Sequence, residues 1–153
     1  MSKSVWQKAL RLFFLLCLVN VVGYIAAGYM TPMTQMWYDG LLKSALNPPE
    51  IVFPVVWSTL FLCLAVSAFL VWGKASPRWF VFQLIFNMLW SFAFFFLHRP
   101  DIALGVTVLL LISIYKTFRA FYPVSKISGI LQVPVFLWCL FALYLNLMIV
   151  LLN

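Results

Sequence analysis

The sequence predicts an all-α membrane protein: a bundle of five transmembrane helices with a long ordered loop between the first and second helices. Hydrophobic residues make up 66% of its 153 positions and charged residues only 8%, whereas a soluble domain carries about 25% charged residues. Five apolar runs approach or exceed the roughly 20 residues that a helix needs to cross a bilayer. So little polar surface cannot cover a globule in water, and lipid is therefore the expected solvent.

Together the five predicted helices form a single domain over residues 1–153. They cover residues 10–29, 51–72, 79–97, 102–122 and 129–152. The later breaks are short and contain turn residues, so neighbouring helices are expected to be antiparallel. The first run also resembles a signal peptide, because three basic residues precede or begin it. It continues to Tyr29, beyond the usual signal core, which favours a retained helix.

The connection between the first two helices, residues 30–50, is the exception to these short breaks. About twenty residues is long for a loop in a compact domain, and such loops are usually functional or disordered. This one contains Trp37, Tyr38 and the pair Pro48-Pro49, which are not typical of a disordered linker. We therefore expect an ordered lid over one end of the bundle.

The basic residues predict the orientation of the chain. Eight of the 10 Lys and Arg residues lie on the amino-terminal side of a five-helix arrangement, and only Lys43 and Arg99 lie on the other side. Cytoplasmic loops are enriched in Lys and Arg, so the amino terminus is predicted to be cytoplasmic and the carboxyl terminus external. The basic residues form no dense patch, and no nucleic-acid partner is expected.

Polar and aromatic side chains inside the apolar runs indicate a binding site, since an unpaired polar group is costly in hydrocarbon. Gln83 and Asn87 are four residues apart and therefore share a face of the third helix. Trp57, Trp90 and Trp138 lie well inside their helices rather than at the membrane interfaces. Aromatic walls with one or two amides suit a flat hydrophobic ligand. Helix packing is the alternative role for each residue taken singly.

Several other chemistries have no support in the sequence. It contains no Ser/His/Asp set, no Gly-rich phosphate loop and no HExxH motif, and no acidic residue lies in the middle of a predicted span. Cys17, Cys63 and Cys139 lie in separate helices, and His98 is the single histidine. Neither a disulfide framework nor a metal site is expected.

Three blocks of sequence resemble those of one family of membrane proteins. The first is Trp-Tyr-Asp-Gly-Leu-Leu-Lys at 37–43, followed by Asn-Pro-Pro at 47–49 and Phe-Pro-Val-Val-Trp at 53–57. The others are Phe-Asn-Met-Leu-Trp-Ser at 86–91 and the segment 133–146. In this order and spacing they resemble the TspO/MBR family, also called tryptophan-rich sensory proteins, translocator protein or peripheral-type benzodiazepine receptor.

The resemblance implies a five-helix bundle, often a homodimer in the lipid bilayer, that binds porphyrins or haem (tetrapyrroles) as ligands and requires no further cofactor. Some members bind sterols or benzodiazepine-type ligands. Some bacterial members are credited with light-dependent porphyrin degradation, which would use Trp57 and Trp138. By motif position, the family's pocket maps to Tyr38, Trp57, Phe61, Asn87, Trp90, Trp138 and Ala142.

Two departures from the family pattern affect these expectations. Ser44 and Leu46 replace the Pro and Trp of the pattern Lys-Pro-x-Trp-x-Pro-Pro, which leaves the rigidity of the lid open. No basic residue follows Tyr144, so the weak sterol motif is incomplete and a sterol role is disfavoured. The leading prediction is a non-enzymatic receptor or transporter-like sensor for tetrapyrroles in a bacterial cell membrane. The alternatives are a light-dependent porphyrin-degrading enzyme and an accessory or structural subunit.

Overall fold

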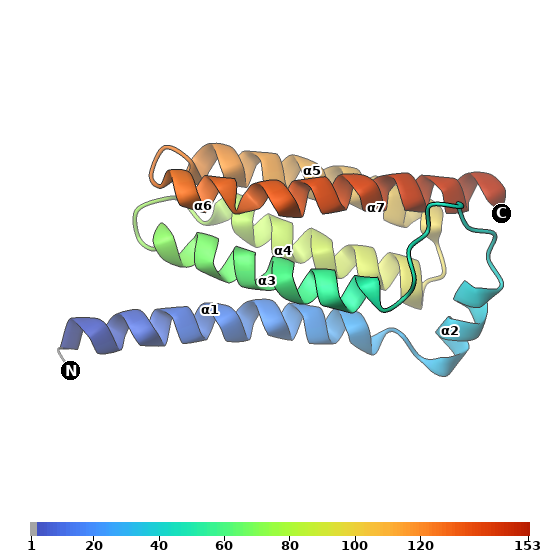
Figure 1. The fold of residues 1–153 in the computed structure, drawn as a ribbon, viewed down its shortest axis with the longest axis horizontal. Helices are drawn as coiled ribbons and strands as arrows, with labels where there is room; N and C mark the ends of the chain where they lie inside the picture. Colours follow the sequence, from blue (N-terminus) through green and yellow to red (C-terminus); the bar gives the residue numbers. More distant parts are fainter. Residues whose placement is uncertain (1–2) are drawn as a thin grey trace.

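The computed structural model describes residues 3–153 as an all-helical bundle (Figure 1). In chain order its helices are α1 (Lys3–Gly28), α2 (Pro32–Asp39), α3 (Val52–Leu70), α4 (Arg78–Ser91), a π-helix (Phe92–Phe96), α5 (Pro100–Phe121), α6 (Lys126–Ile130) and α7 (Gln132–Leu152). Within this described part, the segments long and apolar enough to cross a membrane are Val5–Gly28, Val52–Leu70, Arg78–Phe96, Pro100–Phe121 and Lys126–Leu152. The predicted fold class, a five-helix transmembrane bundle, is confirmed.

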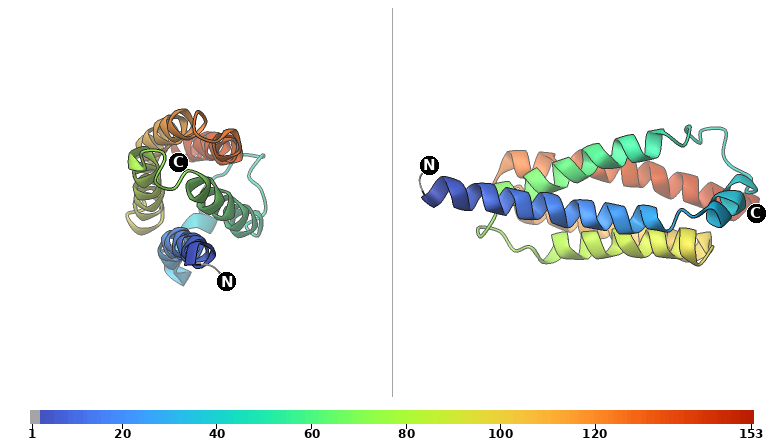
Figure 2. Two further views of the ribbon diagram at one scale, coloured as in Figure 1. Left: turned by 90° about the vertical axis from the view of Figure 1, so that its left-hand side faces the viewer. Right: turned by 90° about the horizontal axis from the view of Figure 1, so that it is seen from below.

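The five long segments stand side by side and form a ring when viewed along the bundle (Figure 2). Around this ring α1 packs against α3 and α4, α5 packs against α4 and α7, and α3 meets both α6 and α7. Consecutive spans run in opposite directions, so the two termini lie at opposite ends of the bundle (Figure 1). α2 and the loop after it cover the end that holds the carboxyl terminus, and we call this end the lid end.

Three helix boundaries differ from the prediction, each for a local reason. α1 begins at Lys3 rather than near residue 10, because the less apolar stretch before the apolar run contains no Pro or Gly to stop a helix. α5 begins at Pro100, because proline is favoured in a first turn where its missing N–H is not needed. The last span is divided into α6 and α7 at Leu131, since Pro134 cannot donate to the carbonyl of Ile130. The remaining ends lie within three residues of the prediction.

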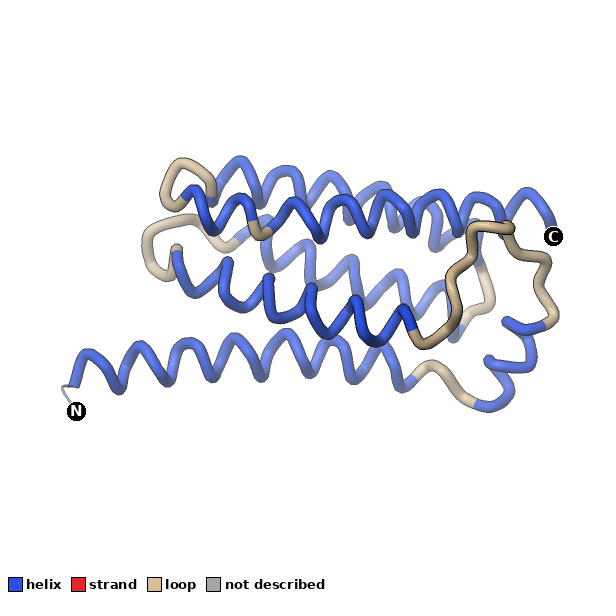
Figure 3. The backbone as a smooth tube through the Cα atoms, in the orientation of Figure 1, coloured by secondary structure: helices blue, strands red, loops and turns tan. Residues whose placement is uncertain are grey.

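The long connection after α1 is ordered, as predicted, but it contains a helix that was not predicted. α2 begins at Pro32, and Thr31 caps it by accepting a hydrogen bond from the backbone N–H of Thr34 at 3.2 Å. The Thr34 hydroxyl donates to the carbonyl of Phe95 at 3.3 Å and so ties α2 to the π-helix. Beyond α2 the chain has no regular secondary structure between residues 40 and 51, and we call this segment the strap (Figure 3).

The half of the bundle away from the lid contains a network of buried polar side chains. Gln83 Nε2 donates to Gln132 Oε1 at 3.1 Å, and Gln132 Nε2 donates to Ser67 Oγ at 2.8 Å. Ser67 Oγ donates to the Ser128 carbonyl at 2.8 Å. All four residues are at most 1% exposed, so the network joins α3, α4, α6 and α7 where an unpaired polar group would be costly.

Candidate ligand-binding site

A small cavity lies inside the bundle, between this polar network and the lid end. It is lined from α3, α4, α5 and α7 by Phe53, Trp57, Asn87, Trp90, Thr107, Leu110, Trp138, Cys139 and Ala142. Its free volume is about 30 Å³, which is enough for one water molecule. A larger ligand therefore enters only if the walls move apart.

Tryptophan rings from three helices form much of the wall, and aromatic neighbours hold them. Trp138 meets Phe53 edge to face, with ring centroids 5.9 Å apart and an interplanar angle of 69°. Trp90 stacks on Phe94 of the π-helix at 5.1 Å and 20°. Such pairs stabilise defined ring positions, so the cavity presents preformed flat surfaces. The Phe53–Trp138 contact is also where α3 meets α7.

Two polar groups on the wall have no partner within the described chain. Nε1 of Trp138 is buried and makes no hydrogen bond there. The amide of Asn87 makes none with any residue from 3 to 153, although Asn87 is only 8% exposed. Thr107, by contrast, donates to the carbonyl of Ala103 at 2.9 Å within its own helix. An unpaired buried polar group costs about 1–3 kcal/mol, so a bound molecule that pairs with the indole N–H and the amide is favoured.

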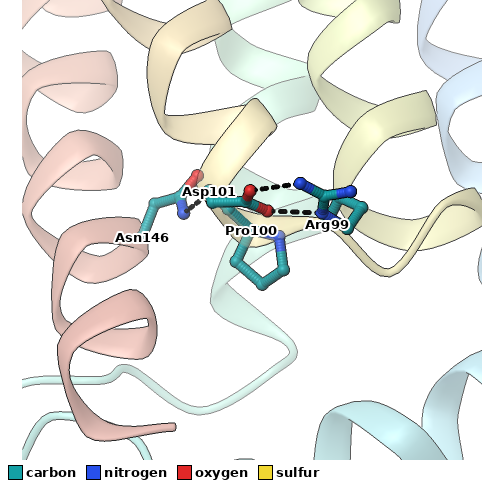
Figure 4. Close-up of polar contacts among 4 residues, drawn as sticks. All are labelled: Arg99, Pro100, Asp101 and Asn146. Carbon is teal, nitrogen blue, oxygen red and sulfur yellow. Dashed lines mark hydrogen bonds and ion pairs between the residues drawn. The ribbon is translucent and has the colours of Figure 1, made fainter.

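Asn146 holds one wall tryptophan in place. Its Oδ1 accepts a hydrogen bond from Trp90 Nε1 at 3.1 Å, and its Nδ2 donates to the carbonyl of Pro100 at 2.8 Å. Figure 4 shows the second contact beside the ion pair of Arg99 and Asp101. Asn146 is 1% exposed and bridges α4, α5 and α7. The orientation of the Trp90 ring therefore depends on it.

The structure brings together five of the seven site residues predicted from the sequence, namely Trp57, Asn87, Trp90, Trp138 and Ala142. Phe61 does not line the cavity. Its ring lies 5.4 Å from that of Trp57 and covers Gly23 of α1, where an added Cβ would overlap it. Phe61 therefore packs between Trp57 and α1.

Tyr38 does not line the cavity either, although the resemblance maps the pocket to it and we expected its ring to point toward the cavity. Its ring is buried against Phe94 and Phe95, with centroids 6.2 and 6.3 Å away. Burial raises the pKa of the Tyr38 phenol, so this hydroxyl stays protonated at neutral pH. Tyr38 contacts the cavity wall only indirectly, because Phe94 stacks on Trp90.

Four lining residues were not predicted: Phe53, Thr107, Leu110 and Cys139. Phe53 precedes Trp57 by four residues, so the two share a helix face, and this spacing was a usable signal. Thr107 was visible as a polar residue in an apolar run. Leu110 and Cys139 carry no signal, since they are apolar positions in apolar helices.

The strap is fastened to the end of α7 by side-chain hydrogen bonds. The Asn153 amide accepts from the backbone N–H of Leu42 at 3.0 Å and donates to the Leu42 carbonyl at 3.1 Å. The hydroxyls of Ser44 and Tyr144 lie 2.8 Å apart. Ser44 stands where the family pattern has proline, so here hydrogen bonds hold a segment that lacks that proline.

The charged side chains lie away from the cavity. None is among the buried side chains of the described residues. Within the same part of the chain, no group of three or more His, Cys, Asp or Glu residues is arranged to hold a metal ion. The lining of the cavity therefore consists of aromatic and aliphatic side chains with a few neutral polar groups.

Comparison with known proteins shows the family of the chain. The profile of the TspO/MBR family matches residues 13–152. The tryptophan-rich protein TspO of Chlorobaculum tepidum is 38% identical over 147 residues, which cover 90% of this chain and 91% of that protein. Protein CrtK of Rhodobacter capsulatus is 39% identical over 119 residues (72% and 74%), and a tryptophan-rich sensory protein of Cereibacter sphaeroides is 34% identical over 114 residues (72% of each). The chain is therefore an integral multi-pass membrane protein of the TspO/MBR family.

Proposed function

We propose that the chain is a membrane receptor or transporter-like sensor that binds a porphyrin or haem between the tryptophans of its cavity. The observation that carries this proposal is the cavity wall itself. Trp57, Trp90 and Trp138 present flat apolar surfaces beside Asn87. The Trp138 N–H has no partner in the described chain, and it and the Asn87 amide are the groups that would pair with a ligand. A tetrapyrrole matches this lining, because it is flat, aromatic and carries polar groups at its edge. One relative's name, tryptophan-rich sensory protein, fits a sensing role.

Binding requires the cavity to open, since pockets for small molecules usually measure about 300–1,000 Å³ and the free volume here is about 30 Å³. The edge-to-face contact of Phe53 with Trp138 joins α3 to α7 and is the simplest contact to break. α3 stays packed on α1 through the fit of Phe61 to Gly23. The hydrogen bonds of Ser67 to Gln132 and Ser128 hold the other half of α3 to α6 and α7. We therefore propose that only the lid-end half of α3, together with α1, moves away from α7 when the ligand enters.

Protoporphyrin IX titrated in the dark into the purified protein tests the proposal. Binding is followed by the absorbance of the porphyrin rather than by quenching of tryptophan fluorescence, because the variants lack some of the tryptophans that would fluoresce. An aromatic contact contributes roughly 0.5–1.5 kcal/mol beyond area burial, so Trp57→Phe and Trp138→Phe should each weaken binding up to about tenfold. Trp72→Phe, just beyond the other end of α3, is the matched control. If the double variant binds as tightly as wild type, the rings only pack the bundle, as an accessory subunit would require.

The second candidate, a light-dependent porphyrin-degrading enzyme, is favoured by one observation. Trp57 and Trp138 line the same cavity from different helices, so both indoles would lie beside a bound porphyrin and could donate an electron to its photoexcited state. Illumination of the loaded protein separates the two functions. Loss of porphyrin absorbance that requires both tryptophans supports the enzyme, and stable absorbance supports the receptor.

We also propose that the chain forms a homodimer, as the family resemblance implies. Large apolar side chains are exposed along α1, among them Phe13, Phe14 and Tyr24, and in a membrane such a surface meets lipid or another helix. Light scattering of the detergent-solubilised protein, corrected for bound detergent, measures the protein mass. A mass of one chain would contradict the dimer without affecting the proposed ligand.

A further inference from the structure

A second and larger hollow lies at the lid end, outside the tryptophan cavity. It measures about 280 Å³ and opens toward the surroundings, between the first turn of α5 and the last turn of α7. Trp37 and Leu41 cover it from the lid, and Ile149 and Val150 form an apolar wall on α7. We call it the lid-end pocket. None of the proposed tetrapyrrole contacts lies in it.

His98 and Trp37 form one side of the lid-end pocket. Their rings stack with centroids 4.3 Å apart and an interplanar angle of 22°. His98 follows the π-helix with φ of 52°, the left-handed conformation that often ends a helix, and this turn directs the chain from the π-helix into α5. Nε2 of His98 is buried without a hydrogen-bond partner in the described chain. The stacked imidazole and indole rings therefore form an aromatic side of the pocket, while the Nε2 atom itself is covered.

The rim of the lid-end pocket carries a paired positive and negative charge. Arg99 Nε donates to Asp101 Oδ1 at 2.8 Å, and Asp101 itself lines the pocket. Figure 4 shows this ion pair. The two side chains are 56% and 51% exposed, so both charges remain accessible to a partner. The pocket thus combines a dipolar charge pair, an aromatic ring and an apolar wall.

The pocket also lies at the level where the bilayer ends. The α5 span begins at Pro100 and the last span ends at Leu152, so these ends mark the boundary between hydrocarbon and headgroups. A molecule in the pocket can place a polar group at the ion pair and an apolar chain along Val150 and the exposed Leu151. This is the shape of a membrane lipid.

We propose that the lid-end pocket binds the headgroup of a zwitterionic phospholipid. The ammonium would lie at the Asp101 carboxylate and the Trp37 ring, and the phosphate at the exposed Arg99 guanidinium. The charge of the lid end favours a zwitterion over an anionic lipid. Its basic residues are only Lys43 and Arg99, against three acidic ones, whereas the basic residues that would attract anionic lipid lie mostly at the other end.

Native mass spectrometry of the delipidated full chain, titrated with phosphatidylethanolamine or phosphatidylglycerol, tests this site. We expect one phosphatidylethanolamine per chain to bind more tightly than any phosphatidylglycerol. Val150→Trp fills the pocket without changing charge and should weaken that binding roughly tenfold. Val133→Trp, an exposed position at the other end of α7, is the matched control and should bind as wild type does. Arg99→Gln with Asp101→Asn should abolish the preference between the two lipids.

Equal or tighter binding of phosphatidylglycerol by wild type would overturn the proposal, as would unchanged binding by Val150→Trp. If Val150→Trp does not elute as a folded protein, the double charge variant decides, and a preserved preference for phosphatidylethanolamine rejects the site. The tetrapyrrole proposal is tested separately. Trp57→Phe with Trp138→Phe should leave lipid binding intact, so failure of one site does not imply failure of the other.

Discussion

Replacement of Asn146 by leucine, a residue of similar size and shape, removes two buried hydrogen bonds at once. Trp90 loses the acceptor 3.1 Å from its Nε1, and the Pro100 carbonyl loses the donor at 2.8 Å. Hydrogen bonds between transmembrane helices contribute about 0.6 kcal/mol on average and up to about 1.7 kcal/mol. Asn146→Leu should therefore lower the free energy of unfolding by about 1–3 kcal/mol.

Asn87→Leu is the matched substitution, and it is not expected to lower the free energy of unfolding. The Asn87 amide makes no hydrogen bond within residues 3–153 and Asn87 lines the cavity, so leucine removes no bond. The free energy of unfolding should stay the same or rise by up to about 1 kcal/mol. Affinity for protoporphyrin should fall about fivefold, which corresponds to one lost hydrogen bond of about 1 kcal/mol.

Unfolding of both variants in mixed micelles, titrated with sodium dodecyl sulfate and followed by circular dichroism, measures the two stabilities. Porphyrin absorbance gives the two affinities. Asn146→Leu should lose stability and some affinity, because Trp90 is no longer oriented, whereas Asn87→Leu should lose affinity alone. If Asn87→Leu unfolds as easily as Asn146→Leu, Asn87 has a structural partner and is not a ligand group, and this reasoning is refuted.

Three further predictions concern helix packing, topology and the lid. Gly23→Ala should lower the free energy of unfolding by about 1–3 kcal/mol, because the added Cβ overlaps the ring of Phe61. Gly105→Ala is the control, since a Cβ there meets nothing within 4 Å, and it should be neutral in the same unfolding titration. A reporter active only in the cytoplasm and fused after Asn153 should be silent, and activity there would contradict the predicted orientation. Tyr38→Ala removes the ring that packs on the π-helix. The lid should become more susceptible to protease and porphyrin binding should weaken, while the bundle stays folded. Unchanged affinity would show that the lid does not affect the site.

The candidate site could be predicted from the sequence only where residue type and depth in the membrane were informative. Asn87 and the three tryptophans were recognisable because amides and indoles are unusual in the middle of apolar helices. Phe61, which the resemblance maps to the pocket, lies beside Trp57 and outside the cavity lining, and motif position alone does not tell which of the two rings faces inward. The role of Asn146 in bridging Trp90 to Pro100 could not be predicted, because it depends on residues distant in sequence.

The sequence by itself determined that the chain forms five membrane-spanning helices and roughly where they lie. In lipid every backbone group must be hydrogen-bonded within the protein, and bilayer thickness sets the helix length, so composition and run length are sufficient. Only the tertiary structure decided which helix faces meet. The π-helix at Phe92–Phe96 has more residues per turn than the regular α-helix that spacing rules assume, and it places Phe94 between Tyr38 and Trp90. Local spacing cannot encode that contact, because it depends on where a separate segment, the lid, packs.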